Sequence, residues 1–197
     1  MPDINTWVGI SCPSACGGTL NYGALPTDPN CVSVPPLSEI SDIYIRPTGA
    51  TDAFDYSGGD PVAVSGAIDN SDTTNTKTKH LVVIGSQGDP EENIYSGPKG
   101  TEVVSKRRYT VEARTPITAQ SIYDFLRQMQ CNNLNFTFRF GTRGGYLFGG
   151  INGISPAASN ARFPKVEGED GVEVGVLILA YDTDNGDTDR HPNPLAS

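Results

Sequence analysis

A single amphipathic helix among strands is the feature that most restricts how this chain can fold. In the segment 118–131, apolar residues recur at positions i, i+3, i+4 and i+7: Ile122, Phe125, Leu126 and Met129. This spacing predicts one helix of about three to four turns, with one apolar stripe. Immediately afterwards, Leu134, Phe136, Phe138 and Phe140 alternate with Asn135, Thr137 and Arg139. Strict alternation predicts a strand with one buried face.

The other periodic segments all predict strands. We expect them at 41–46, 62–68, 80–84, 101–114, 146–151 and 172–181, separated by loops at 49–61, 69–77, 85–100, 141–145 and 152–171. The segment 101–114 alternates Val103, Tyr109, Val111 and Ala113 with charged residues, and its length predicts a bend or bulge. Thr118 is the expected N-cap of the helix. The pattern indicates a mainly β protein, an antiparallel β-sandwich or barrel with one flanking α-helix at about 119–131.

The two ends of the chain differ from this β-rich body. Residues 1–38 contain six prolines and the pair Gly17-Gly18, without sustained periodicity, yet also apolar residues such as Trp7. Such a segment cannot build its own core, so we expect an extended arm that docks on its own domain or on a neighbouring subunit. Residues 182–197 are acidic and contain proline, which predicts a flexible tail. The predicted organisation is an arm at 1–38, a β-sandwich domain at 39–181 and a tail at 182–197.

The charge and hydropathy of the chain argue against nucleic-acid and membrane binding. The formal net charge is −9, whereas a surface that grips phosphates needs clustered Lys and Arg. The one basic cluster, Lys106-Arg107-Arg108, is short, and we interpret it as a solvated or subunit-contacting face. No secretory signal and no apolar run of the ~20 residues that a membrane helix needs are visible. We therefore expect a soluble product made in a cytosol.

Four cysteines leave three interpretations open: Cys12, Cys16, Cys31 and Cys131. Free thiols are the favoured one, because disulfides are rare in a cytosol and the C-x3-C spacing is not a common zinc pattern. A disulfide and a zinc site remain the alternatives. Whether the four residues meet in space does not follow from the sequence.

No catalytic, cofactor or metal motif emerges from the remaining residues. The acidic run 182–189 fails the register of an EF-hand calcium loop, and no helix follows the Gly-rich stretches at 141–145 and 149–153. Of the two histidines, His191 falls in the predicted tail, and His80 fits a strand end better than a general base. Paired carboxylates such as Glu91-Glu92 and those at 167–170 fall in predicted loops and read as solvated. The sequence thus predicts a protein that is not an enzyme.

The pattern of strands and one helix across 101–181 resembles the tail-tube proteins of long-tailed bacteriophages. The start of the chain, Ser11-Cys-Pro-Ser-Ala-Cys-Gly-Gly18, is similar to that of small structural proteins of phages that infect Bacteroidetes. The resemblance covers about half of the chain and includes no diagnostic motif. It implies a β-sandwich flanked by one helix, a long hairpin lining the lumen, and arms that reach neighbouring rings. The cross-subunit arm would be residues 1–38 or the loops at 69–79 and 85–100.

This resemblance implies a virion structural protein, assembled in the host cytoplasm. It would self-assemble into stacked homo-oligomeric rings and contact other virion proteins. Its contact with passing DNA would be passive, because an acidic lumen does not hold phosphates. The Cys-containing start and the long Pro-containing arm also suit a capsid decoration or tail-completion protein. A carbohydrate-binding or adhesive module is the other alternative, if Tyr44, Tyr56 and Tyr95 are exposed for stacking on sugars.

Overall fold

The structure is a computed structural model that describes residues 39–64, 67–96, 102–131, 134–163, 173–183 and 190–194. The chain divides into two units, Met1–Leu37 and Ser38–Ser197, and every described residue lies in the second. The predicted N-terminal arm and its cysteines lie outside the described residues.

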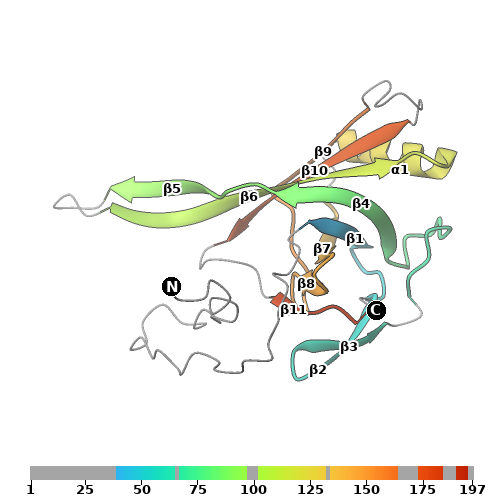
Figure 1. The fold of residues 1–197 in the computed structure, drawn as a ribbon, viewed down its shortest axis with the longest axis horizontal. Coiled ribbons are helices and arrows are strands. Elements are labelled where there is room, and N and C mark those ends of the chain that lie inside the picture. Colours follow the sequence, from blue (N-terminus) through green and yellow to red (C-terminus); the bar gives the residue numbers. More distant parts are fainter. Residues whose placement is uncertain are drawn as a thin grey trace, which may run out of the picture. The chain divides into compact units, whose positions relative to one another are not determined.

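Antiparallel strands and one helix make up the described unit (Figure 1). Nine strands form one sheet in the order β11-β8-β7-β1-β4-β6-β10-β9, with β5 paired to β6, and β2 and β3 form a separate hairpin. The elements are β1 (Ile40–Pro47), β2 (Phe54–Ser57), β3 (Asp60–Val64), β4 (Lys79–Gln87), β5 (Glu91–Ser96), β6 (Glu102–Pro116), α1 (Gln120–Gln130), β7 (Phe136–Thr142), β8 (Tyr146–Phe148), β9 (Ala158–Arg162), β10 (Val174–Thr183) and β11 (Arg190–Pro192).

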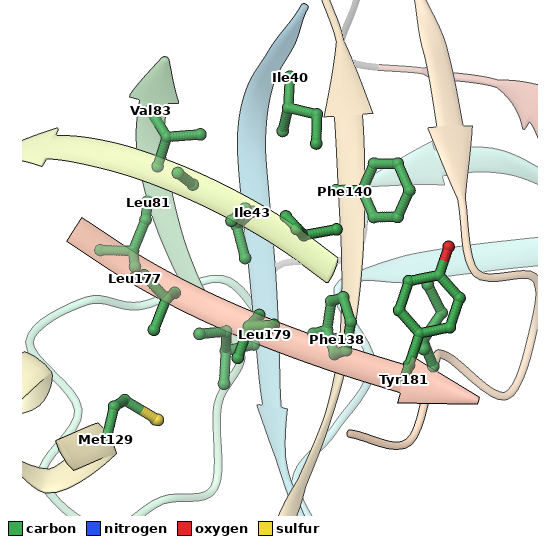
Figure 2. Packing of buried hydrophobic residues seen from close by; sticks show 14 of the residues in the cluster. Ile40, Ile43, Leu81, Val83, Met129, Phe138, Phe140, Leu177, Leu179 and Tyr181 are labelled. Carbon is green, nitrogen blue, oxygen red and sulfur yellow. The ribbon is translucent and has the colours of Figure 1, made fainter. Parts of the chain in front are cut away.

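The main core lies between the two halves of this folded sheet. Figure 2 shows β10 crossing over β1 and β7, with Leu177, Leu179 and Tyr181 directed at Ile43 and Phe138. The rings of Phe138 and Tyr181 lie 5.9 Å apart at 69°, an edge-to-face contact between strands that are distant in the sheet order. Strands that cross in this way are typical of orthogonal sheet packing. The mainly antiparallel β fold with one flanking helix is confirmed, as a sandwich-like sheet that does not close into a barrel.

The helix α1 covers one end of this core with the predicted apolar stripe. Leu126 is fully buried and Met129 is 4% exposed, whereas Ile122 and Phe125 pack at the margin. Gly175 of β10 allows this close approach, because a Cβ atom there would lie 2.2 Å from Cδ1 of Leu126. The single helix therefore closes one end of the sheet, as the periodicity of the sequence predicts.

The N-terminus of α1 lacks the cap that was predicted from Thr118. Ala119 occupies the N-cap position with extended backbone, no side chain caps the helix, and the first turn contains no acidic residue. The prediction was wrong by one residue, because a good capping side chain sits one position too early to reach the free N–H groups.

We therefore expect Ala119→Ser to raise the free energy of unfolding by about 0.5–1 kcal/mol, because a serine oxygen accepts a hydrogen bond from a free N–H. Chemical denaturation followed by circular dichroism would measure the gain. Ala119→Val, which adds volume without an acceptor, is the control and should give no gain. Equal stability of the serine variant and the parent would contradict this account of the cap.

Four strands lie where the sequence predicted loops or tail. β2 lies within 49–61, β5 within 85–100, β9 within 152–171, and β11 within the predicted flexible tail. The predicted return strand at 146–151 shortens to β8, and the strand predicted at 62–68 begins earlier and ends earlier, as β3. Three of the four are edge strands of three to six residues, which carry too little alternation to be recognised from sequence.

β7 is buried on both faces, not on one as predicted. Phe136, Phe138 and Phe140 do face the main core, but Arg139 on the opposite face is only 1% exposed. A second apolar cluster covers that face, formed by Tyr44, Ala53, Phe54 and Leu147 from β1, the β2 hairpin and β8. Leu134, predicted to begin the buried face, lies before the strand and is 40% exposed.

Candidate functional site

The candidate functional site is a two-stranded arm made of β5 and residues 102–108 of β6. Figure 1 shows this arm extending away from the body of the sheet, beyond the place where β4 pairs with β6. The strand β5 pairs only with β6 among the described residues. Each of its six residues adds ~3.3 Å, so the arm reaches roughly 20 Å. This arm replaces most of the loop predicted at 85–100.

Charge complementarity and a bulge shape the arm. Across it, Glu91 lies opposite Arg108 and Glu92 opposite Arg107, and cross-strand pairs of opposite charge favour this register. Between the Lys106 pair and the Val104 pair the register shifts, so that Ser105 has no residue opposite it. The bulge predicted for the long strand is therefore present, on the part of β6 that belongs to the arm.

Ion pairs fix the base of the arm. Arg107 Nε lies 3.0 Å from Glu92 Oε1, and Arg108 donates two hydrogen bonds, of 2.8 and 3.1 Å, to the carboxylate of Asp182 on β10. This bidentate contact lowers the pKa of Asp182 and raises that of Arg108. The basic cluster of the sequence is thus partly neutralised, and Asp182, the first residue of the rejected calcium loop, is engaged by arginine.

Beyond the ion pairs at its base, the described side chains of the arm are exposed. Every β5 side chain that the structure describes is exposed, and Ile94 retains 56% of its surface. The backbone groups on the outer edge of β5 and on the β10 side of residues 102–106 form no ladder with another described strand. An isolated two-stranded hairpin is only marginally stable in water, and such edges invite pairing with another chain.

The loop at 69–79, the other loop that could be a cross-subunit arm, folds onto itself. The Asp72 carboxylate accepts hydrogen bonds from the Thr74 hydroxyl and from the backbone N–H groups of Thr74, Thr76 and Lys77, which together hold its pKa far below the ordinary value. Lys79 Nζ donates to the carbonyl oxygens of Asp69, Asn70 and Asp72. Because its polar groups are satisfied internally, this loop offers fewer free groups to a partner than the arm does.

A cluster of two arginines and one aspartate, of which Arg139 is buried and Arg46 and Asp52 are partly exposed, lies beside the β2–β3 hairpin. Arg139 binds Asp52 through two hydrogen bonds, of 2.9 and 2.8 Å, and donates to the carbonyl oxygens of Gly150 and Ile151. Arg46 also binds the Asp52 carboxylate, and the carbonyl oxygen of Asn152. The cluster therefore ties the hairpin to the loop 149–153, which is a structural role.

Both described histidines pair with aspartates. His80 Nε2 lies 2.7 Å from Asp42 Oδ1 and its ring stacks on Tyr44, and His191 Nδ1 lies 2.7 Å from Asp60 Oδ1. Ser41 is also close, but its hydroxyl donates to the Asp42 carboxylate and not to the imidazole. A serine nucleophile must instead hydrogen-bond to the histidine, so this trio lacks the order of a catalytic triad.

The Asp42–His80 pair makes the stability of the sheet sensitive to acid. Burial by itself raises the pKa of Asp42, but hydrogen bonds from His80 and Ser41 outweigh it and leave the pKa below its ordinary value. A carboxyl group whose folded pKa is lowered stabilises the fold above its unfolded pKa of ~3.9, and this stabilisation disappears as the pH falls through the folded pKa.

We expect Asp42→Asn to lower the free energy of unfolding by about 1–2 kcal/mol near neutral pH, since a hydrogen bond to a charged, partly exposed group is lost. Denaturant titrations from pH 7 to about pH 2 should show the two proteins converging at the acid end. Asp55→Asn, on the exposed side of β2, should match the parent throughout. A difference that persists at the lowest pH would contradict the assignment to the ionised Asp42.

The structure describes one of the four cysteines. Cys131 is free and exposed, while Cys12, Cys16 and Cys31 lie outside the described residues. Within the described ranges, no three His, Cys, Asp or Glu side chains are placed to hold a metal ion, and no helix is long and apolar enough to span a membrane.

Of the three tyrosines predicted for sugar stacking, the structure describes the side chains of Tyr44 and Tyr56, and neither is fully exposed. Tyr44 is 1% exposed, and Tyr56 is half-buried with its hydroxyl bonded to the Gly150 carbonyl oxygen. Burial raises the pKa of Tyr56 to about 12. The Tyr95 side chain lies outside the described residues. Tyr44 is buried because the β2–β3 hairpin covers the sheet face on which it lies, and Tyr56 is half-buried because it belongs to that hairpin and packs against the same cluster.

Comparisons with known proteins give no information on the function of this chain. No protein-family model, curated protein or solved structure matches this chain. The arm was missed in the sequence because Gly88, Asp89 and Pro90 read as loop residues. The six residues of β5 are too few for an alternation of polar and apolar side chains to indicate a strand. The length of the strand predicted at 101–114 was the one indication in the sequence that a second strand pairs with it.

Proposed function

We propose that this protein is a virion structural subunit, most concretely a tail-tube subunit that assembles into stacked rings around a conduit for DNA. The observation that carries the proposal is the β5–β6 arm, whose two outer edges pair with no other described strand and whose Ile94 is exposed. Among the described side chains of β5, none is buried within this unit, so the contacts described for the monomer do not account for the arm. A closed assembly would cover these edges and Ile94 with neighbouring subunits.

Two further properties support an assembly of this kind. The mainly antiparallel sheet with one flanking helix is the architecture that the resemblance to tail-tube proteins implies. The formal net charge of −9 suits a conduit through which DNA slides without being held. The arginines at the base of the arm are paired with Glu92 and Asp182, which leaves fewer free cations to bind phosphates.

Electron microscopy of the purified protein across concentration and salt tests the proposal. We expect rings or hollow tubes of uniform diameter. A monomer that stays dispersed under every condition would overturn the proposal. Single rings that never stack would instead favour a capsid decoration or tail-completion protein, and bound glycan with no assembly would favour a carbohydrate-binding module.

Two exposed isoleucines, one on β5 and one on β4, offer a matched pair of variants. Ile94 on the arm is 56% exposed and Ile84 on β4 is 58% exposed. We expect Ile94→Asp to raise the concentration needed for assembly by roughly ten- to a hundredfold, since one isoleucine buried at each contact contributes about 1.5–3 kcal/mol. Ile84→Asp should leave it nearly unchanged. Analytical ultracentrifugation measures both, and equal effects of the two variants would remove the arm as the basis of the proposal.

A further inference from the structure

The last described strand, β11, is held to the body by a short and polar set of contacts. It pairs with β8 through three residue pairs only, Arg190 with Phe148, His191 with Leu147 and Pro192 with Tyr146. The guanidinium of Arg190 lies 3.5 Å over the ring of Tyr146. These contacts place β11 at one edge of the sheet, where it occupies the side of β8 that does not pair with β7.

Two side chains make the docking of β11 specific. His191 Nδ1 lies 2.7 Å from Asp60 Oδ1 on β3, so the strand is tied to the β2–β3 hairpin as well as to β8. Asn193 is 7% exposed, and its backbone N–H donates a 2.8 Å hydrogen bond to the carbonyl oxygen of Gly145. Its side chain fills the space beside Gly141, where a Cβ atom would lie 2.9 Å from Nδ2 of Asn193.

This arrangement is that of a peptide bound by strand addition. Main-chain pairing to a sheet edge supplies affinity, and pockets for alternate side chains supply specificity. Here Asp60 recognises the imidazole of His191, and the space beside Gly141 accommodates the side-chain amide of Asn193. No large apolar side chain of residues 190–194 is among the buried core, so β11 is held by strand pairing and polar contacts, which include a hydrogen bond between Asn193 and the buried Tyr44.

We propose that the β8 edge is a binding site for the segment Arg190–Pro194 and that, in the assembled protein, it takes this segment from a second copy of the chain. The strand β10 ends at Thr183, and the six residues 184–189 that precede β11 contain no large apolar side chain. Exchange of an identical segment between copies preserves every contact described above, so it needs no new complementary surface. The exchange rests on the proposed self-assembly; the peptide site itself does not.

Mixing two single-cysteine chains tests the exchange directly. In a background with all four native cysteines changed to serine, one chain carries Tyr146→Cys and the other, with a larger tag, carries Pro192→Cys. These residues are opposite one another, and the Cα separation of such pairs suits a disulfide. A disulfide-linked heterodimer on a non-reducing gel can form only if the segment of one chain binds the β8 edge of the other.

The controls separate specific docking from random collision. Ile178→Cys and Asn160→Cys occupy opposite positions on β10 and β9, in the body, and should give no heterodimer when mixed. Adding Asp60→Asn to the Tyr146→Cys chain should lower the heterodimer yield by roughly tenfold, since the hydrogen bond to a charged partner is lost. A synthetic peptide of residues 188–197 should compete with the tagged chain, and the same peptide with His191→Ala should not.

The outcomes for exchange and for tube assembly are distinguishable. Rings in the microscope without any heterodimer would overturn the exchange and leave the assembly intact. A heterodimer without rings would support the exchange and overturn the tube. A heterodimer whose yield is unaffected by Asp60→Asn and by the peptide would overturn the specific site.

Discussion

Replacing Asp52 with alanine is expected to lower the free energy of unfolding by about 3–5 kcal/mol, the largest effect of any substitution considered for this protein. The change removes the carboxylate shared by Arg139 and Arg46. The Arg139 side chain is 2% exposed, so its charge cannot recover full hydration, and a second guanidinium lies close by. Breaking a buried ion pair on one side costs far more than the intact pair contributes, because a buried charge is left uncompensated.

A double-mutant cycle checks the cause of this loss. Asp52→Ala combined with Arg139→Met removes both buried charges and retains much of the side-chain volume, so we expect part of the lost stability to return. Asp55→Ala, an exposed carboxylate on β2, should change stability by less than about 0.5 kcal/mol. Chemical denaturation followed by circular dichroism measures the parent, the single variants Asp52→Ala and Arg139→Met, the double variant and the Asp55→Ala control. If the double variant is as unstable as the sum of the single ones, the burial of charge is not the cause.

Gly85→Ala is expected to destabilise the fold by about 1–3 kcal/mol through overpacking. A Cβ atom at Gly85 would lie 2.7 Å from the carbonyl oxygen of Glu112 and 3.0 Å from Cα of Ala113, both on β6. These are backbone atoms of a paired strand, so the neighbour cannot rotate away as a flexible side chain would. The clash lies at the short ladder that joins β4 to β6.

Gly88→Ala is the matched control for Gly85→Ala. It lies three residues along the same segment, and a Cβ atom there would have only an ordinary contact, 3.7 Å from the Thr110 carbonyl oxygen. We expect it to be neutral or slightly stabilising, since alanine restricts the unfolded chain more than glycine does. The melting temperatures of the two variants, measured by thermal unfolding, are compared. Equal melting temperatures would contradict close strand approach as the reason for glycine at position 85.

The elements predicted correctly from the sequence are those whose signal is local. The stripe of Ile122, Phe125, Leu126 and Met129 identifies α1 to within one residue at each end, because helical periodicity depends only on neighbours along the chain. The alternation in β6 correctly placed Tyr109, Val111 and Ala113 in the core. The length of that strand also predicted the bulge that is found near Ser105.

The features missed from the sequence depend on contacts between distant residues. The alternation predicted that Arg139 lies on the solvated face of β7. Its burial depends on the carboxylate of Asp52, a residue far earlier in the chain, which cannot be inferred from the neighbours of Arg139. The strand β5 pairs with β6 in a register that places Glu91 and Glu92 opposite Arg108 and Arg107, residues more than ten positions later in the chain. Likewise, β11 pairs with a strand more than forty residues earlier, and nothing within its own three residues indicates a partner.

The continuity of β6 has a mechanical consequence. The strand runs without interruption from the arm into the body, where ten residue pairs join it to β10. A pull on the arm along the strand direction therefore loads these pairs in shear, so they must yield together and not one after another. A force across the strand would instead peel β5 away pair by pair. The arm thus resists tension along its length and gives way to bending.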